Sequence, residues 1–309
     1  MAHEKDKNSP LTYREHWSRE GFYGDGVVVT RSVHTADYTS VTGPHAPHRL
    51  NVKSLALPDR HDPAALPLPV LRASTGVQLS VSARVAAMPH LISNVEADEL
   101  HFVQDGEMRY HTAFGAITGL PGDFVCIPRA VPYTVEPKNG MSLSIIIESP
   151  GALKIDPRPD FQVQVERASP IERSLEPPKK VLLVKSHDEI TRYEKPHDLF
   201  SYSSIGGGNV PVWKVNLRAL FNNESGPPAQ FLSAPNSDVL CYNLCARPSR
   251  RPPIHTNADY DEVIFYSSGP GAWGRVDEPG TLTWVPKGIS HHGPVENVPE
   301  GFQAWLLES

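Results

Sequence analysis

Three side chains in the C-terminal part of the sequence have the types and spacing of a metal site. His255 and Glu262 lie in the stretch RPPIHTNADYDEVIFYSSG, and His291 ends the stretch PGTLTWVPKGISH. A single histidine near a strand is more often a surface or hydrogen-bonded residue than a ligand. Two neutral imidazoles with one carboxylate, however, leave open positions on a metal and suit an Fe(II) ion that activates oxygen. The sequence therefore predicts that His255, Glu262 and His291 bind iron.

The third ligand is followed directly by another histidine, in the stretch GISHHGP. Counting from the turn at Pro286 selects His291 as the ligand, whereas the triplet HGP selects His292. Adjacent residues of a strand point to opposite faces, so both imidazoles cannot readily bind one metal ion. We expect His291 to be the ligand and His292 to lie beside it.

Other side chains near these ligands are candidates for contact with a substrate. A substrate that binds the metal through a hydroxyl group must give its proton to a base, and His292, followed by Tyr260, is the candidate proton acceptor. A substrate carboxylate would need a cation, which Arg275 or Lys287 could supply. Both cations would otherwise be ordinary solvated surface charges.

The stretch that carries the ligands has a counterpart far upstream. NVEADELHF (94–102) matches NADYDEVIF (257–265), and PGDFVCIPRAVPY (121–133) matches PGTLTWVPKGISH (279–291). Two blocks that match in the same order at nearly the same separation indicate an internal duplication.

The upstream copy lacks two of the three ligands. In the alignment of the repeats, Ile92 takes the place of His255 and Tyr133 that of His291, while Glu99 stands opposite Glu262. We therefore expect no metal in the first repeat, and we interpret His101 and His111 as structural residues.

Both repeats consist of short β segments that end at glycine or at Pro-Gly pairs. His255 and Asn257 would share one face of a strand, the ADYD turn would return Glu262 on a neighbouring strand, and the Pro-Lys-Gly turn would lead to His291. The expected fold is all-β, with two similar small barrels at residues 1–155 and 181–309 and a proline-rich connector at 156–180. The one expected helix is short and begins at Ser186.

The bulk composition excludes several classes of protein. The 309 residues carry a net charge of −6 without a long basic block, which argues against a nucleic-acid partner. No apolar run approaches the roughly 20 residues that span a bilayer. The three cysteines, Cys126, Cys241 and Cys245, are too few and too irregularly spaced for a disulfide framework. We expect a cytoplasmic protein with free thiols, and a homo-oligomer remains open.

The motifs together resemble a known family. The spacing of His255, Asn257, Glu262, Gly269, Gly280, Pro286, Gly288 and His291 is that of the cupin signature. The block from Asp98 to Tyr133, the tract VPVWKVNLRALFNNESGPPAQF, the pattern P-x-x-H-x-N with DEV, and the triplet HGP resemble the homogentisate 1,2-dioxygenase-like bicupins over roughly residues 90 to 309.

This resemblance implies an Fe(II) enzyme that opens a hydroxylated aromatic ring with both atoms of O2. It implies His255 and Glu262 as iron ligands, with His291 or His292 as the third. The expected partners are thus a small, homogentisate-like aromatic substrate and O2.

Two other functions fit a bicupin. A metal-dependent isomerase acting on a sugar-like substrate would polarise a carbonyl and would need no O2. A binding module would keep the barrel without any chemistry. The loss of ligands in the first repeat argues against the binding module, because it shows that folding does not require them.

Overall fold

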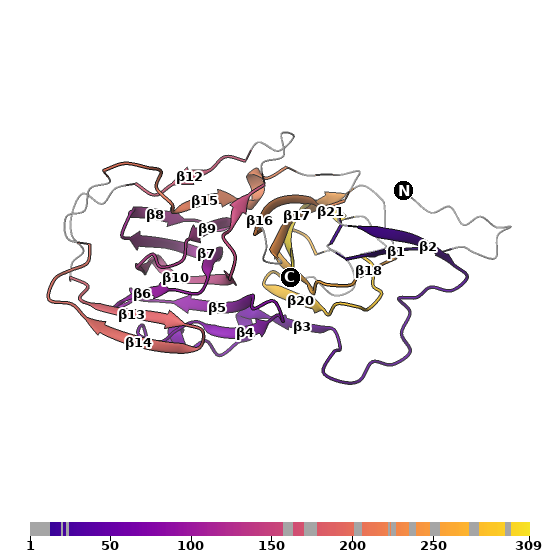
Figure 1. Ribbon diagram of the computed structural model, residues 1–309, viewed down its shortest axis with the longest axis horizontal. Helices are drawn as coiled ribbons and strands as arrows, with labels where there is room; N and C mark the ends of the chain where they lie inside the picture. Colours follow the sequence, from indigo (N-terminus) through magenta and orange to yellow (C-terminus); the bar gives the residue numbers. More distant parts are fainter. Residues whose placement is uncertain are drawn as a thin grey trace. The chain divides into compact units, whose positions relative to one another are not determined.

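The computed structural model describes residues 13–19, 21–22, 25–156, 163–169, 178–200, 206–221, 223, 227–234, 239–247, 254–271, 278–293 and 298–309. These residues form β-strands and three short 3-10 helices, η1 (Val52–Ser54), η2 (Pro58–Arg60) and η3 (Leu217–Ala219) (Figure 1). The all-β prediction is confirmed. Within the described ranges, no helix is long and apolar enough to cross a membrane.

The chain forms two compact units. Unit 1 comprises Met1–Leu55, Phe221–Ser233 and Asp238–Ser309, and unit 2 comprises Ala56–Leu220 and Ala234–Ser237. The repeats predicted from sequence are present, but their boundaries at 155 and 181 do not separate the two units. Parts of the predicted connector, residues 157–162 and 170–177, lie outside the described residues.

Unit 2 is built around two long antiparallel strands, β7 (Asp98–Thr112) and β10 (Tyr133–Ser149). The hydrogen-bonded order of its sheet is β12-β15-β9-β7-β10-β6-β13-β14, with β8 beside β7, β5 beside β10 and β4 beside β5. The other strands of this sheet are β4 (Leu68–Arg72), β5 (Gln78–Arg84), β6 (Leu91–Asn94), β8 (Gly115–Gly119), β9 (Asp123–Ile127), β12 (Glu166–Arg167), β13 (Val181–Ser186), β14 (Glu189–Glu194) and β15 (Trp213–Asn216). The two-residue strand β11 (Lys154–Ile155) is not part of it.

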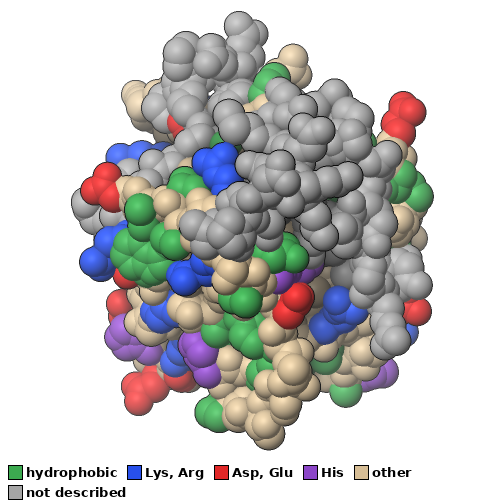
Figure 2. All heavy atoms as spheres, turned by 90° about the vertical axis from the view of Figure 1, so that its right-hand side faces the viewer, with side chains coloured by type: hydrophobic (Ala, Val, Ile, Leu, Met, Phe, Trp, Pro, Cys, Tyr) green, Lys and Arg blue, Asp and Glu red, His purple; other side chains and the backbone are tan. Residues whose placement is uncertain are grey.

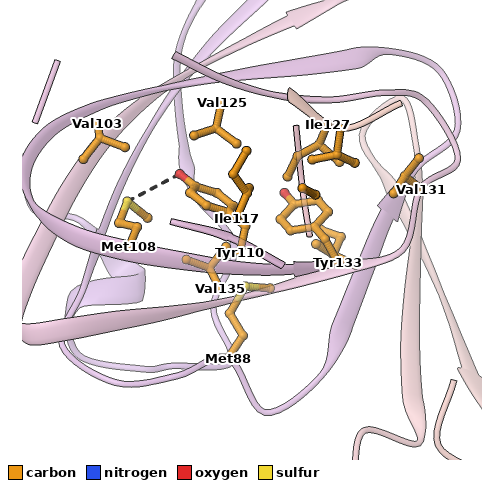
Figure 3. Close-up of a cluster of buried hydrophobic side chains, with 13 residues drawn as sticks. Met88, Val103, Met108, Tyr110, Ile117, Val125, Ile127, Val131, Tyr133 and Val135 are labelled. Carbon is orange, nitrogen blue, oxygen red and sulfur yellow. Dashed lines mark hydrogen bonds between the residues drawn. The ribbon is translucent and has the colours of Figure 1, made fainter. Parts of the chain in front are cut away.

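The interior of unit 2 is apolar around Tyr110 and Tyr133, and Figure 3 shows these rings among Val103, Val125 and Ile127. These side chains bury almost all of their surface. Ile92, His101 and Tyr133 line a small cavity in this interior.

Unit 1 contains a sheet with the strand order β16-β17-β21-β19-β20-β3 and a second sheet with the order β18-β1-β2. The strands are β1 (Tyr13–Ser18), β2 (Gly26–Arg31), β3 (His48–Asn51), β16 (Ala229–Ala234), β17 (Val239–Arg247), β18 (Ile254–Asn257), β19 (Glu262–Ser268), β20 (Thr281–Val285) and β21 (Val298–Glu308). On the face drawn in Figure 2, hydrophobic side chains are interspersed with charges of both signs and with histidines.

The two units repeat one arrangement of strands. In unit 1, β1 pairs in parallel with β18 and β3 pairs with β20. In unit 2, β13 pairs in parallel with β6 and β15 pairs with β9. The helices η1 and η3 follow β3 and β15, and each begins at an asparagine cap, Asn51 or Asn216.

Each repeat therefore gives its N-terminal arm to the barrel of the other repeat. The arm that precedes the first barrel belongs to unit 1, where indigo β1 and β2 lie beside yellow β18 (Figure 1). The arm at 181–220 belongs to unit 2, where β13 lies beside β6. The predicted boundaries missed this exchange because local β patterns do not identify the partner of a strand.

The predicted helix at Ser186 was wrong. Residues Val181–Glu194 form the hairpin β13–β14, in which Ser186 pairs with Glu189 across a two-residue turn. His187 adopts the left-handed conformation, with φ of 53°, that such tight hairpin turns need. The segment also pairs in parallel with β6, and a helix could not form the backbone hydrogen bonds of that pairing. The three cysteines carry free thiols, as predicted.

Candidate metal centre

His255, Glu262 and His291 converge inside unit 1. His255 lies in β18, Glu262 begins β19, and the backbones of His255 and His291 exchange two hydrogen bonds of 2.9 Å. Glu262 Oε2 lies 3.4 Å from His255 Nε2 and 3.3 Å from His291 Nε2. One potential ligand atom from each of the three residues lies within 4.8 Å of the other two, and among the described residues only this group has such a geometry.

Two turns that are hydrogen-bonded to each other, one after β18 and one after β20, hold this arrangement. The amide of Gly288, which has φ of 78°, donates to Asn257 O at 2.7 Å. The amide of Lys287 donates to Asp261 Oδ1 at 2.8 Å. The Pro-Lys-Gly turn is thereby bound to the turn between β18 and β19, so the chain that leaves it brings His291 opposite His255.

The three side chains form a charged cluster in the absence of a metal. Burial disfavours the Glu262 carboxylate, but His291 and His255 outweigh it and hold the pKa of Glu262 far below its usual range. Burial also opposes a charge on His291, yet Glu262 raises the pKa of that imidazole. A metal cation at this point would replace the proton as the partner of the carboxylate.

The two neighbouring histidines, His291 and His292, have different surroundings. His291 faces Glu262, whereas His292 has its Nδ1 2.6 Å from Gly293 O and its ring 5.3 Å from the ring of His34. The structure therefore includes His291, and not His292, in the cluster.

Two of the other three sequence candidates lie among the described residues. Tyr260 is buried in the turn between β18 and β19. Lys287 has its Nζ 3.4 Å from the carbonyl of Asp259. Arg275 lies outside the described residues. The roles assigned to Tyr260, Lys287 and Arg275 stay predictions.

A second buried carboxylate adjoins the cluster. Glu308 pairs across the sheet with Glu262, and its carboxyl group accepts hydrogen bonds from Tyr242 Oη at 2.8 Å and Asn257 Nδ2 at 3.1 Å. Burial and the neighbouring Glu262 raise the pKa of Glu308 to about 8. Sequence reasoning missed this residue, although IIIES and WLLES end corresponding strands and place Glu148 opposite Glu308 in the repeat.

The N-terminal arm also reaches the cluster. Gly21, with φ of 64°, lies so close to Glu308 that an added Cβ would be 1.8 Å from its Oε2. The next residue, Phe22, places its ring 5.5 Å from the rings of both His255 and Tyr242. Nothing in the local sequence around residue 22 signals this contact.

Unit 2 shows what fills the same position without the ligands. Tyr133 and Ile92 are paired there, as His291 and His255 are in unit 1. Glu99 accepts a hydrogen bond from Tyr133 Oη at 2.5 Å and from Asn94 Nδ2 at 3.0 Å, and it lies 3.1 Å from His101 Nε2. Neighbouring side chains thus satisfy this carboxylate without a metal ion.

Two relatives with known names match the chain in sequence. One is a protein of Saccharolobus solfataricus named "Putative dioxygenase", 26% identical over 223 residues, or 65% of this chain and 57% of that protein. The other is the homogentisate 1,2-dioxygenase of Bradyrhizobium diazoefficiens, 34% identical over 277 residues, or 79% of this chain and 58% of that enzyme. No protein-family model matches the chain.

The chain is a bicupin related in sequence to homogentisate 1,2-dioxygenase. The bicupin spans little more than half the length of these two relatives. Its fold is similar to that of the salicylate 1,2-dioxygenase of Pseudoaminobacter salicylatoxidans, with a TM-score of 0.51, 11% identity and coverage of 85% of this chain and 81% of that chain. The resemblance predicted from the motifs is confirmed.

Proposed function

We propose that this bicupin is a non-haem Fe(II) dioxygenase that cleaves the ring of a small hydroxylated aromatic compound. The observation that carries the proposal is the convergence of His255, Glu262 and His291 in one unit of a chain whose named relatives are dioxygenases. Two imidazoles and a carboxylate on one side of a metal are the ligand set of Fe(II) oxygenases.

The residues fit such an ion. The two Nε2 atoms and Glu262 Oε2 face a common point, and Glu262 is a charged carboxylate surrounded by two imidazoles. When bound, Fe(II) would bring the substrate hydroxyl and O2 together and would conduct electrons from the electron-rich ring to O2.

The proposed acceptor for the proton of a phenolic hydroxyl is His292, the residue that follows His291. Its Nδ1 lies 2.6 Å from Gly293 O, which favours the neutral tautomer with its proton on Nδ1. The ring of Phe22 beside His255 offers an apolar contact for a flat substrate.

The test is oxygen uptake by the Fe(II)-loaded protein with gentisate, homogentisate, hydroxyanthranilate and hydroquinone-type rings. Iron is loaded without oxygen, and air-saturated buffer starts the reaction. We expect one ring compound to consume O2 in equal amount and to lose its aromatic absorbance, and the variant Glu262→Ala to consume none. Substrate conversion at the same rate without O2 would instead support an isomerase.

A further inference from the structure

A buried carboxylate of the N-terminal arm joins the two segments that carry the histidines. Glu15 lies in β1, which pairs in parallel with β18 so that Glu15 stands opposite Ile254 and His16 opposite His255. Only 5% of Glu15 is exposed. Glu15 itself is not among the three clustered residues.

One oxygen of Glu15 connects the neighbours of both histidines. Oε1 accepts hydrogen bonds from Thr256 Oγ1 at 3.2 Å and from Ser290 Oγ at 3.0 Å. Thr256 directly follows His255, and Ser290 directly precedes His291. The two hydroxyl oxygens are also 2.9 Å apart.

The other oxygen of Glu15 is held by its own arm. Oε2 accepts hydrogen bonds from Arg31 Nε and from Thr35 Oγ1, the latter at 3.0 Å. Burial disfavours the charged form, but the hydrogen bonds from Arg31, Thr35, Ser290 and Thr256 outweigh it and lower the pKa of Glu15. Glu15 is therefore a fixed, charged hydrogen-bond acceptor. Because adjacent residues of a strand point to opposite faces, it lies on the face of β18 opposite to the ligand cluster.

Unit 2 lacks the carboxylate and one of the two hydroxyl groups of this connection. In the matching registers Leu182 corresponds to Glu15, because Leu182 pairs with Leu91 as Glu15 pairs with Ile254. Ser93 then corresponds to Thr256, and Pro132, which precedes Tyr133, corresponds to Ser290. The unit without a histidine pair thus has an apolar side chain where the unit with one has a carboxylate, and a proline cannot offer a hydroxyl.

We propose that Glu15 is a positioning residue for the metal centre, which sets the separation of His255 and His291 through Thr256 and Ser290. The inference rests on the proposed function. The pairing of His255 and His291 is an isolated bridge outside the regular strands, so few backbone hydrogen bonds hold the two imidazoles together. The side-chain connection supplies the additional restraint.

The expected consequence is a loss of metal affinity that exceeds the loss of stability. Residues that orient metal ligands without binding the metal themselves typically change metal affinity about 10–100-fold when they are replaced. We expect Glu15→Leu, which installs the residue of unit 2, to weaken metal binding by that factor, and Glu15→Gln to weaken it less.

The experiment titrates metal-free protein with Co(II), by chelator competition for affinity and by visible absorption for coordination geometry. The matched control is Asp59→Asn in unit 2, because Asp59 is a buried carboxylate that accepts hydrogen bonds from Ser82 Oγ and from the amide of Ala83. We expect Glu15→Leu to lower Co(II) affinity and alter its spectrum, and Asp59→Asn to lower the unfolding temperature without changing either.

Two outcomes separate this inference from the proposed function. Unchanged Co(II) affinity and spectrum in folded Glu15→Leu would overturn the role of Glu15, whereas failure of the unmodified protein to bind Co(II) would overturn the metal centre itself. If Glu15→Leu does not fold, Ser290→Ala breaks one hydrogen bond of the same connection. That variant should weaken Co(II) binding several-fold, and an unchanged affinity would refute the inference.

Discussion

Unit 2 should become a second metal centre when its two missing ligands are restored. The variant carries Ile92→His and Tyr133→His, and it keeps Glu99. Because Ile92 and Tyr133 are paired in unit 2 as His255 and His291 are in unit 1, the new imidazoles should face the existing carboxylate.

The cost to the metal-free variant follows from the contacts it loses. The hydrogen bond from Tyr133 to the charged Glu99 is worth about 1.5–3 kcal/mol. Ile92 is 4% exposed, and removing such a buried side chain costs about 1.5–3 kcal/mol more. The free energy of unfolding of unit 2 should therefore fall by about 3–6 kcal/mol. A metal at a free concentration about 1,000 times its dissociation constant would restore about 4 kcal/mol.

Elemental analysis and thermal unfolding with and without Co(II) measure both effects. We expect two metal ions per chain in place of one, and a larger metal-dependent rise in the unfolding temperature than in the unmodified protein. The single variant Ile92→His is the control, since it leaves Tyr133 bound to Glu99 and should hold one ion. A folded double variant that still binds one ion would refute the equivalence of the two positions.

Three further predictions concern the centre in unit 1. His291→Ala should be isolated largely free of metal and inactive, whereas His292→Ala should keep its metal and turn over about 10²–10⁴-fold more slowly. Elemental analysis measures the metal content, and oxygen uptake measures the activity. The reverse pattern would make His292 the ligand. Metal affinity should rise with pH, by up to about tenfold per unit while His291 is protonated, because Glu262 raises the pKa of His291 and the metal must displace that proton; an affinity independent of pH would contradict this reasoning. Glu308, whose pKa burial and Glu262 raise to about 8 from 4.5, holds a proton in the folded state that the unfolded chain releases. The metal-free protein should therefore lose stability as pH rises from about 4.5 to 8, and Glu308→Gln should reduce that loss in urea unfolding; equal slopes in the two proteins would show that Glu308 does not cause it.

Local pattern was sufficient to predict the duplication and the position of the candidate ligands. Both repeats place asparagine, acidic and apolar residues at the same spacing, and the ladders of the structure follow that alignment: Ile92 pairs with Tyr133 where His255 pairs with His291. A strand alternates its faces with a period of two residues, so a sequence alignment in register already assigns equivalent side chains to equivalent faces.

Local sequence rules gave a wrong prediction for residues 181–194. A polar stretch with a capping serine satisfies the local rules for a short helix, but the hydrogen-bonding edge of β6 lies beside it in the fold. The ladder available from a neighbouring strand is a tertiary contribution, and it outweighs a weak helix propensity.

The sequence by itself determined that the chain is a duplicated β protein with one set of two histidines and a glutamate. Tertiary structure alone decided which arm joins which barrel, and with it the presence of Glu15, Gly21 and Phe22 around a centre whose ligands lie more than 200 residues later. The bridge to His255 also brings His291, the residue favoured by the turn count, next to Glu262. The physical reason is that side-chain spacing is a local property of a strand, whereas its pairing partner and register depend on backbone hydrogen bonds between distant segments.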